Sequence, residues 1–102
     1  MESKQVKDLI INWAIEKGIA FSGNSEKQAI KLVEEVGELC SAVLKDNTEE
    51  IVDAIGDIRV VITILSYMYG LDDDKCLESA WNVIKNRTGR TIGGTFIKSE
   101  DL

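Results

Sequence analysis

Proline is absent from this chain of 102 residues, and its eight glycines gather in a few short stretches. Proline breaks a helix interior because its ring fixes φ and removes a backbone donor, and glycine weakens a helix through its conformational freedom. A chain without proline and with clustered glycines therefore favours long, uninterrupted helices. We expect an all-α fold.

Apolar side chains at helical spacing predict a first helix over residues 2–17, ended by Gly18. After the loop GIAFSGNS, a capping box of Ser25 and Gln28 predicts a second helix over residues 26–45. The core stripe expected on this second helix consists of Leu32, Val36, Leu39 and Val43.

The third and fourth helices follow from the same kind of pattern. Asn47 can cap a helix over residues 49–68, whose apolar second half predicts a central buried helix or a subunit interface. Asp72, Asp73 and Asp74 precede a fourth helix over residues 75–87, which Gly89 ends. The remainder, TIGGTFIKSEDL, carries a Gly-Gly turn typical of a short hairpin or an ordered tail.

The length predicts a single domain, residues 1–102, with a small core that we expect a homodimer or homotetramer to complete. The polar N-terminus resembles no signal peptide, and the longest apolar stretch, residues 60–69, is far shorter than the ~20 residues that a membrane span requires. We therefore expect a cytoplasmic protein without a membrane partner.

Charge and composition exclude several classes of function. The net charge of −6 disfavours duplex nucleic acid as a partner, so a phosphorylated ligand would need a metal ion or a local basic cluster. The chain has no histidine, which excludes imidazole acid–base catalysis, histidine-containing triads and zinc sites with histidine ligands. Cys40 and Cys76 lie within apolar helical patterns and are expected to be buried free thiols.

The second helix concentrates carboxylates in the run EEVGEL, with Glu34, Glu35 and Glu38. Glu35 and Glu38 lie one turn apart, with Cα atoms about 5 Å from each other, so their charges repel unless a cation lies between them. On the third helix, Glu50, Asp53 and Asp57 share one flank.

If these two helices are antiparallel, the carboxylates of both face one pocket at the edge of the core. Carboxylate oxygens are hard ligands that suit Mg²⁺, with Mn²⁺ as the alternative. The competing interpretation is that most acidic clusters on helices are simply solvated faces.

The residues resemble the MazG-like, all-α nucleoside triphosphate pyrophosphohydrolases, which carry an E-E-x-x-E motif on one helix and an E-x-x-D motif on the next. The run from Glu34 to Glu38 matches the first motif, DAIGDI resembles the second with Asp57 as its aspartate, and WNVIKNRTGRTIGGTFIKSEDL is similar to the ending of short phage and bacterial members. The resemblance covers roughly residues 25–102. It implies a four-helix bundle and Mg²⁺-dependent hydrolysis of a nucleoside triphosphate to monophosphate and pyrophosphate, with Glu35 or Glu38 orienting or deprotonating the water.

The chain departs from the second motif at Ala54, where the family usually has glutamate. Three outcomes stay open: a site with fewer ligands, a replacement carboxylate from Glu50 or Asp53, or a degenerate, non-catalytic member. The metal ligands implied by resemblance and spacing together are therefore Glu34, Glu35, Glu38, Glu50, Asp53 and Asp57.

The residues expected to contact the substrate lie near the end of the fourth helix. Lys85, Arg87 and Arg90 form a local basic run that can bind phosphate oxygens, although cations also favour any helix C-terminus. The resemblance places Asn82 and Lys85 near the triphosphate. Four aromatic residues could stack on a base: Trp13, Phe21, Trp81 and Phe96. Each is more typical of a core, and Phe21 is the best candidate because it lies in the loop, outside the helical pattern.

Two other functions compete with nucleoside triphosphate hydrolysis. A non-catalytic helical scaffold or regulator would need no metal, and its apolar third helix would serve as an interface. A related all-α phosphohydrolase, acting on phosphoribosyl-ATP or a dinucleotide, would share the carboxylates and differ in its products.

Overall fold

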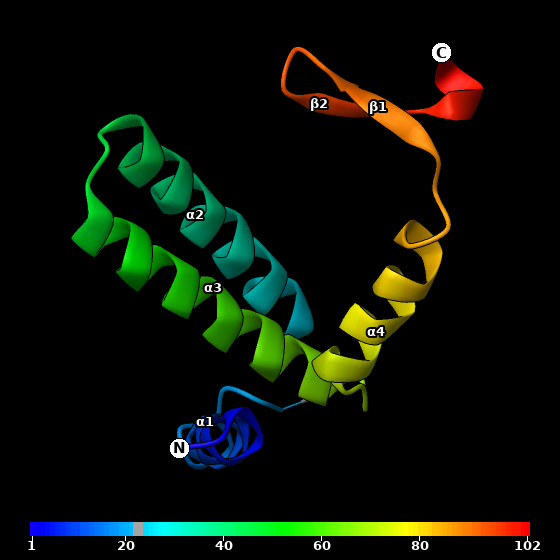
Figure 1. Cartoon of the computed structure of the whole chain (residues 1–102). Coiled ribbons are helices and arrows are strands. Elements are labelled where there is room, and N and C mark those ends of the chain that lie inside the picture. The colour runs from blue at the N-terminus through cyan, green and yellow to red at the C-terminus, as the bar shows by residue number, and fades with distance from the viewer. Residues whose placement is uncertain (22–23) are drawn as a thin grey trace.

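The computed structural model describes residues 1–21 and 24–102 and confirms the all-α class. Four helices carry the chain, and a small antiparallel hairpin with a final 3₁₀ turn follows them (Figure 1). Among the described residues, no helix combines the length and the apolar character needed to cross a membrane. The elements are α1 (Ser3–Glu16), α2 (Ser25–Leu44), α3 (Thr48–Met68), α4 (Asp73–Ile84), β1 (Gly89–Ile92), β2 (Thr95–Lys98) and η1 (Ser99–Asp101).

The start of α2 differs from the prediction. Ser25 is already helical, so the expected capping box of Ser25 and Gln28 is wrong, and Asn24 is the N-cap residue. The Asn24 side chain instead donates hydrogen bonds to the carbonyls of Gly18 (3.3 Å) and Ile19 (3.2 Å), which ties the loop back to the end of α1. Residues 22–23 of the predicted loop lie outside the described residues.

The caps of α3 and α4 use the residues that the sequence indicates. Asn47 Oδ1 accepts a hydrogen bond from the Glu50 N–H at 3.1 Å, which confirms the cap predicted for the third helix. Asp72 Oδ1 accepts one from the Asp74 N–H at 2.9 Å, so α4 begins two residues before the predicted start. The predicted end of α4 is wrong, because the helix ends at Ile84 and Gly89 belongs to β1.

The core lies along the seam where α2 and α3 run side by side (Figure 1). On α2 the buried positions are Glu35 and Ala42, seven residues apart, rather than the predicted Val36 and Val43, which are 43% and 55% exposed. On α3 the matching pair is Ala54 and Val61, again seven residues apart. Alanines on both helices allow a close approach, and this rotation of α2 turns the Glu35 carboxylate into the seam.

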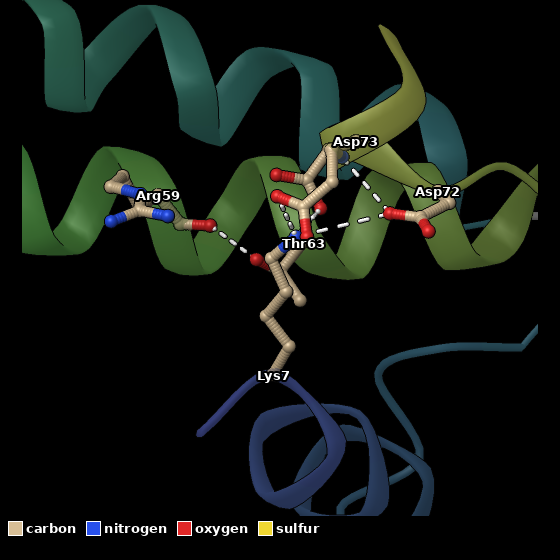
Figure 2. A network of polar contacts seen from close by, with 6 residues as sticks. Lys7, Arg59, Thr63, Asp72 and Asp73 are labelled. Atoms are coloured by element: carbon tan, nitrogen blue, oxygen red, sulfur yellow. Dashed lines mark hydrogen bonds and ion pairs between the residues drawn. The ribbon is translucent and has the colours of Figure 1, made fainter. Parts of the chain in front are cut away.

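α1 packs against α3 and is fastened to the start of α4 by an ion-pair cluster (Figure 2). Lys7 Nζ lies 2.7 Å from both Asp73 Oδ1 and Asp74 Oδ1, and 3.9 Å from Asp72 Oδ1. Beside it, the buried Thr63 hydroxyl donates to the Arg59 carbonyl at 2.8 Å, which satisfies a polar group inside α3.

Beyond that cluster, α4 and the hairpin extend away from the other helices (Figure 1). The radius of gyration of 16.5 Å exceeds the about 13 Å typical of a domain of this length. In the part of the chain that the structure describes, α4 has no buried residue, and its apolar side chains Leu77, Trp81 and Ile84 are 71%, 56% and 48% exposed.

Several side chains expected inside are therefore outside in the single chain. Both cysteines are exposed free thiols, which corrects the prediction that Cys40 and Cys76 are buried. Trp13, Trp81 and Phe96 are about half exposed rather than core residues. Cys76, Trp81 and Phe96 lie on α4 and the hairpin, which extend away from the other helices, so their side chains stay exposed in the single chain.

The ending forms the hairpin that the Gly-Gly turn indicates. β1 and β2 pair antiparallel with Ile92 opposite Thr95, which leaves a two-residue turn of Gly93 and Gly94. Both turn residues have positive φ (58° and 82°), as the turn that matches the twist of a hairpin requires, and glycine adopts this conformation without strain.

Candidate metal centre

α2 and α3 bring three carboxylates into one cluster. Carboxylate oxygens of Glu35, Glu38 and Asp57 all lie within 4.8 Å of one another. Glu35 and Glu38 come from successive turns of α2, and Asp57 comes from the neighbouring stretch of α3. Oxygens this close can share one divalent cation, since Mg²⁺–oxygen distances are about 2.1 Å.

Glu35 is the most constrained member of the cluster because its side chain is 7% exposed. Its Oε1 lies 3.4 Å from Lys31 Nζ, one helical turn earlier, while its Oε2 is buried without a hydrogen-bond partner among the described atoms. A buried carboxylate oxygen without a partner is costly. A cation or a proton at this position would remove that cost.

Glu38 responds to this neighbour. The Glu35 carboxylate can accept a hydrogen bond from Glu38 only when Glu38 is protonated, and it repels the ionised form, so both effects raise the pKa of the exposed Glu38 above its ordinary value. Weaker contributions from burial and from Asp57 act in the same direction, and Lys31 opposes them. Glu38 thus retains a proton more readily than an isolated glutamate does.

A cavity of about 400 Å³ opens beside the cluster, between α2 and α3. Its lining includes Glu38 and Asp57 of the cluster and also Glu50 and Asp53, the other α3 carboxylates predicted as ligands. The lining residues are Glu38, Ser41, Lys45, Glu50, Asp53, Ala54 and Asp57.

The structure separates the remaining predicted site residues from this cavity. Glu34 is exposed and, within the described chain, belongs to neither the cluster nor the cavity lining. Asn82 borders a separate hollow on α4, and Arg87 borders another beside the hairpin. Lys85 and Arg90 are exposed at the end of α4 and on β1. A single chain therefore does not bring these four residues to the carboxylates.

Two lysines near the carboxylates were not predicted. Lys45 lines the cavity, and Lys31 pairs with Glu35. Their spacing carries the signal that was overlooked, because Lys31 lies four residues before Glu35 and Lys45 lies seven residues after Glu38, on the same face of a helix.

A second acidic cluster, formed by Asp72, Asp73 and Asp74, has a different character. The Lys7 ammonium already occupies the space between its carboxylates (Figure 2). The single ammonium offsets part of the negative charge of this cluster, and the contact holds the start of α4 against α1.

Comparison with known proteins identifies the family of the chain segment that carries the carboxylate cluster. The family model described as phosphoribosyl-ATP pyrophosphohydrolase matches residues 16–82, which include α2, α3 and most of α4. The chain belongs to this family. The family lies within the MazG-like nucleotide pyrophosphohydrolase superfamily, so the resemblance seen in the sequence is confirmed. Membership supports a function of the nucleotide pyrophosphohydrolase type, and the general dependence of the family on divalent metals agrees with the acidic cluster.

A similar protein occurs in Haemophilus phage HP1 (strain HP1c1). It is an uncharacterized 18.2 kDa protein in the rep-hol intergenic region, 43% identical over 63 residues that represent 62% of this chain and 39% of the phage protein. The match thus spans about two fifths of the length of that relative. No solved structure matches the chain.

Proposed function

We propose that this protein hydrolyses nucleoside triphosphates to nucleoside monophosphate and pyrophosphate, with Mg²⁺ held by Glu35, Glu38 and Asp57. The observation that carries the proposal is the buried, unpartnered Oε2 of Glu35 within a cluster of three carboxylates. A solvated acidic face would leave these oxygens to water, whereas here a carboxylate is buried beside two others. Family membership supports the reaction type.

The donor set fits Mg²⁺, with Mn²⁺ as an alternative, because it consists of hard carboxylate oxygens at the edge of a hollow large enough for phosphate groups. When bound, the metal would neutralise phosphate charge and stabilise the charge that develops on the leaving pyrophosphate. Glu50 and Asp53 line the same cavity and are secondary candidates as ligands.

The side chains of the chain itself would position the attacking water. Glu38 borders the cavity, so a carboxylate oxygen that the metal does not use would face the space where an attacking water lies. Glu35 is buried and its carboxylate pairs with Lys31, so it is better suited to hold a metal ion than to accept a proton from water. We therefore assign the orientation and deprotonation of water to Glu38 before Glu35.

Asn82, Lys85, Arg87 and Arg90 remain proposed as substrate-binding residues. Since one chain keeps them away from the cavity, they would reach a nucleotide from a second copy in a homodimer or homotetramer. The exposed apolar face of α4 and the large radius of gyration support such an assembly.

Phosphoribosyl-ATP is the second candidate substrate, and the description of the matching family favours it. Its hydrolysis breaks the same bond between the α- and β-phosphates and releases the same pyrophosphate. The carboxylate cluster serves both reactions, so the two substrates differ only in the contacts made by the nucleoside part.

The deciding experiment is a panel of ribo- and deoxyribonucleoside triphosphates and phosphoribosyl-ATP, each with Mg²⁺ or Mn²⁺, with products separated by anion-exchange chromatography. We expect equimolar monophosphate and pyrophosphate from at least one substrate, and loss of turnover in Glu38→Gln but not in Glu34→Gln. Release of diphosphate and phosphate would exclude the proposed bond cleavage. A protein that turns over nothing, and whose thermal midpoint Mg²⁺ leaves unchanged, would be a scaffold.

A further inference from the structure

We propose that Lys45 is a phosphate-binding residue of the acidic cavity, whose ammonium exchanges its partner Glu50 for a phosphate oxygen when a nucleotide binds. This inference rests on the proposed function and names a further binding residue for it. Neither the family match nor the sequence motifs assign a role to Lys45.

The first support is position. Lys45 caps the C-terminus of α2 and, with Glu38 and Ser41, lines the cavity. The three residues are spaced by three and then four positions, so they share one face of the helix. The ammonium therefore stands over the same hollow as the proposed metal ligands, about two helical turns away along α2.

The second support is the weakness of its present contact. Lys45 Nζ lies 3.7 Å from Glu50 Oε2, beyond the usual length of a charge-assisted hydrogen bond. The two side chains are 61% and 49% exposed, so solvent screens the pair. An ammonium held this loosely can turn toward a phosphate without a large structural cost.

The third support is the balance of charge. Four carboxylates line the cavity, from Glu38, Glu50, Asp53 and Asp57, and Lys45 is the only cationic side chain among its described lining residues. Ala54 lines the cavity at the position where the family's second motif usually has glutamate, so the lining lacks a carboxylate that could hold a further cation. One divalent cation bound at the cluster would leave much of a triphosphate charge uncompensated in an acidic hollow. The Lys45 ammonium supplies positive charge on that side.

The competing role for Lys45 is a purely structural one, as a clasp across the turn that joins α2 to α3. A clasp predicts that removing the ammonium lowers stability and leaves phosphate affinity unchanged. Phosphate binding predicts that removing the ammonium lowers phosphate affinity and leaves stability nearly unchanged.

The test titrates the full chain with Mn²⁺ alone and then, at saturating Mn²⁺, with inorganic pyrophosphate, both by calorimetry. The variants are Lys45→Gln and Lys45→Arg, and the matched control is Lys27→Gln, which removes an equally charged, exposed side chain from the same helix outside the cavity lining. Loss of one charge-assisted hydrogen bond corresponds to roughly a 10- to 100-fold weaker affinity.

We expect Lys45→Gln to weaken pyrophosphate binding by that factor while Mn²⁺ binding stays equal to or tighter than in the wild type. Lys45→Arg should retain most of the affinity, and Lys27→Gln should match the wild type. If Lys45→Gln binds pyrophosphate as the wild type does, or if the wild type binds Mn²⁺ but no pyrophosphate, the Lys45 inference is wrong and the metal site stands. If the wild type binds neither probe, both the inference and the proposed function fail.

Discussion

Glu35 and Glu38 lie one turn apart on α2, and the buried Glu35 carboxylate raises the pKa of the exposed Glu38 through a hydrogen bond and a like charge. A proton on Glu38 would therefore compete with the metal ion proposed for this cluster. This competition gives the site a pH dependence whose sign can be stated before any activity is measured.

The first prediction concerns pH in the metal-free protein. A carboxyl whose pKa is raised on folding contributes stability at low pH, and this contribution is lost as pH rises from the ordinary value of 4.5 through the raised one. Thermal midpoints should therefore fall over that window, and Glu38→Gln should flatten the fall, while the control Glu34→Gln should not. With Mg²⁺ the dependence should reverse, because metal affinity increases as the proton leaves. A fall that persists unchanged in Glu38→Gln would assign the dependence to other groups.

The second prediction separates the cluster from its neighbour Glu34. Glu35→Gln and Asp57→Asn should each lower turnover by about 100-fold or more, because each removes a charged oxygen from the cluster. Metal-free Glu35→Gln should remain folded, since it removes a buried charge and keeps the side-chain volume. Steady-state kinetics and circular dichroism check both statements. Full activity in either variant would remove that residue from the site.

The third prediction concerns assembly. We expect sedimentation equilibrium to give a dimer or tetramer at micromolar concentration, because the apolar face of α4 is uncovered in the single chain. Leu77→Glu places a charge on that face and should shift the distribution toward monomer, whereas Glu78→Gln, on the exposed polar side, should not. If the wild type sediments as a monomer, Asn82 and Lys85 have no route from a partner to the cavity.

Much of the fold was readable from local chemistry. The absence of proline from the whole chain predicts the all-α class correctly. The Asn47 cap and the Gly93-Gly94 turn act over a few residues, and each predicts its element correctly. The sequence did not predict which face of α2 is buried. An apolar stripe that includes Val36 and Val43 has helical spacing, and the buried positions Glu35 and Ala42 have it too. Packing against α3 decides between them, and small residues there favour the alternative that buries a carboxylate.

The grouping of Glu35, Glu38 and Asp57 could be anticipated from the resemblance together with helical spacing, which also suggested the antiparallel pair. The contribution of Lys45 could not, because lysines at helix ends are common and usually only favour the helix dipole. Likewise, the start of α4 is held by a long-range contact from Lys7 to the aspartates of its first turn. Sequence spacing carries no information about such a contact.

The fourth prediction tests that contact. Lys7→Met should lower the free energy of unfolding by about 1–2 kcal/mol, because it leaves three adjacent aspartates without their cation. Lys4→Met is the matched control, since Lys4 is an exposed lysine one turn earlier on α1. Burial lowers the pKa of Lys7, but hydrogen bonds and attraction from Asp73 and Asp74 outweigh this and raise it overall. The wild-type contact should therefore survive to pH above 10.5. Equal denaturation midpoints for both variants would contradict the fastening role.

The last prediction concerns Ala54, which is 4% exposed in the seam and borders the cavity between Glu50 and Asp57. If Glu50 replaces the missing carboxylate, Glu50→Gln should lower activity and weaken Mg²⁺ dependence more than Asp53→Asn does, because the longer glutamate lies on nearly the same face as Ala54 one turn earlier.

Restoring a carboxylate with Ala54→Glu should then destabilise the metal-free protein, since it adds a buried like charge, and tighten Mg²⁺ binding for the same reason. In the Glu50→Gln background it should recover part of the lost activity. Calorimetry with Mg²⁺ and turnover measured in all four combinations of the two substitutions check the coupling. If the wild type is inert and Ala54→Glu alone creates activity, the chain is a degenerate member of its family: the carboxylate cluster then binds without catalysing, and the fold alone is retained.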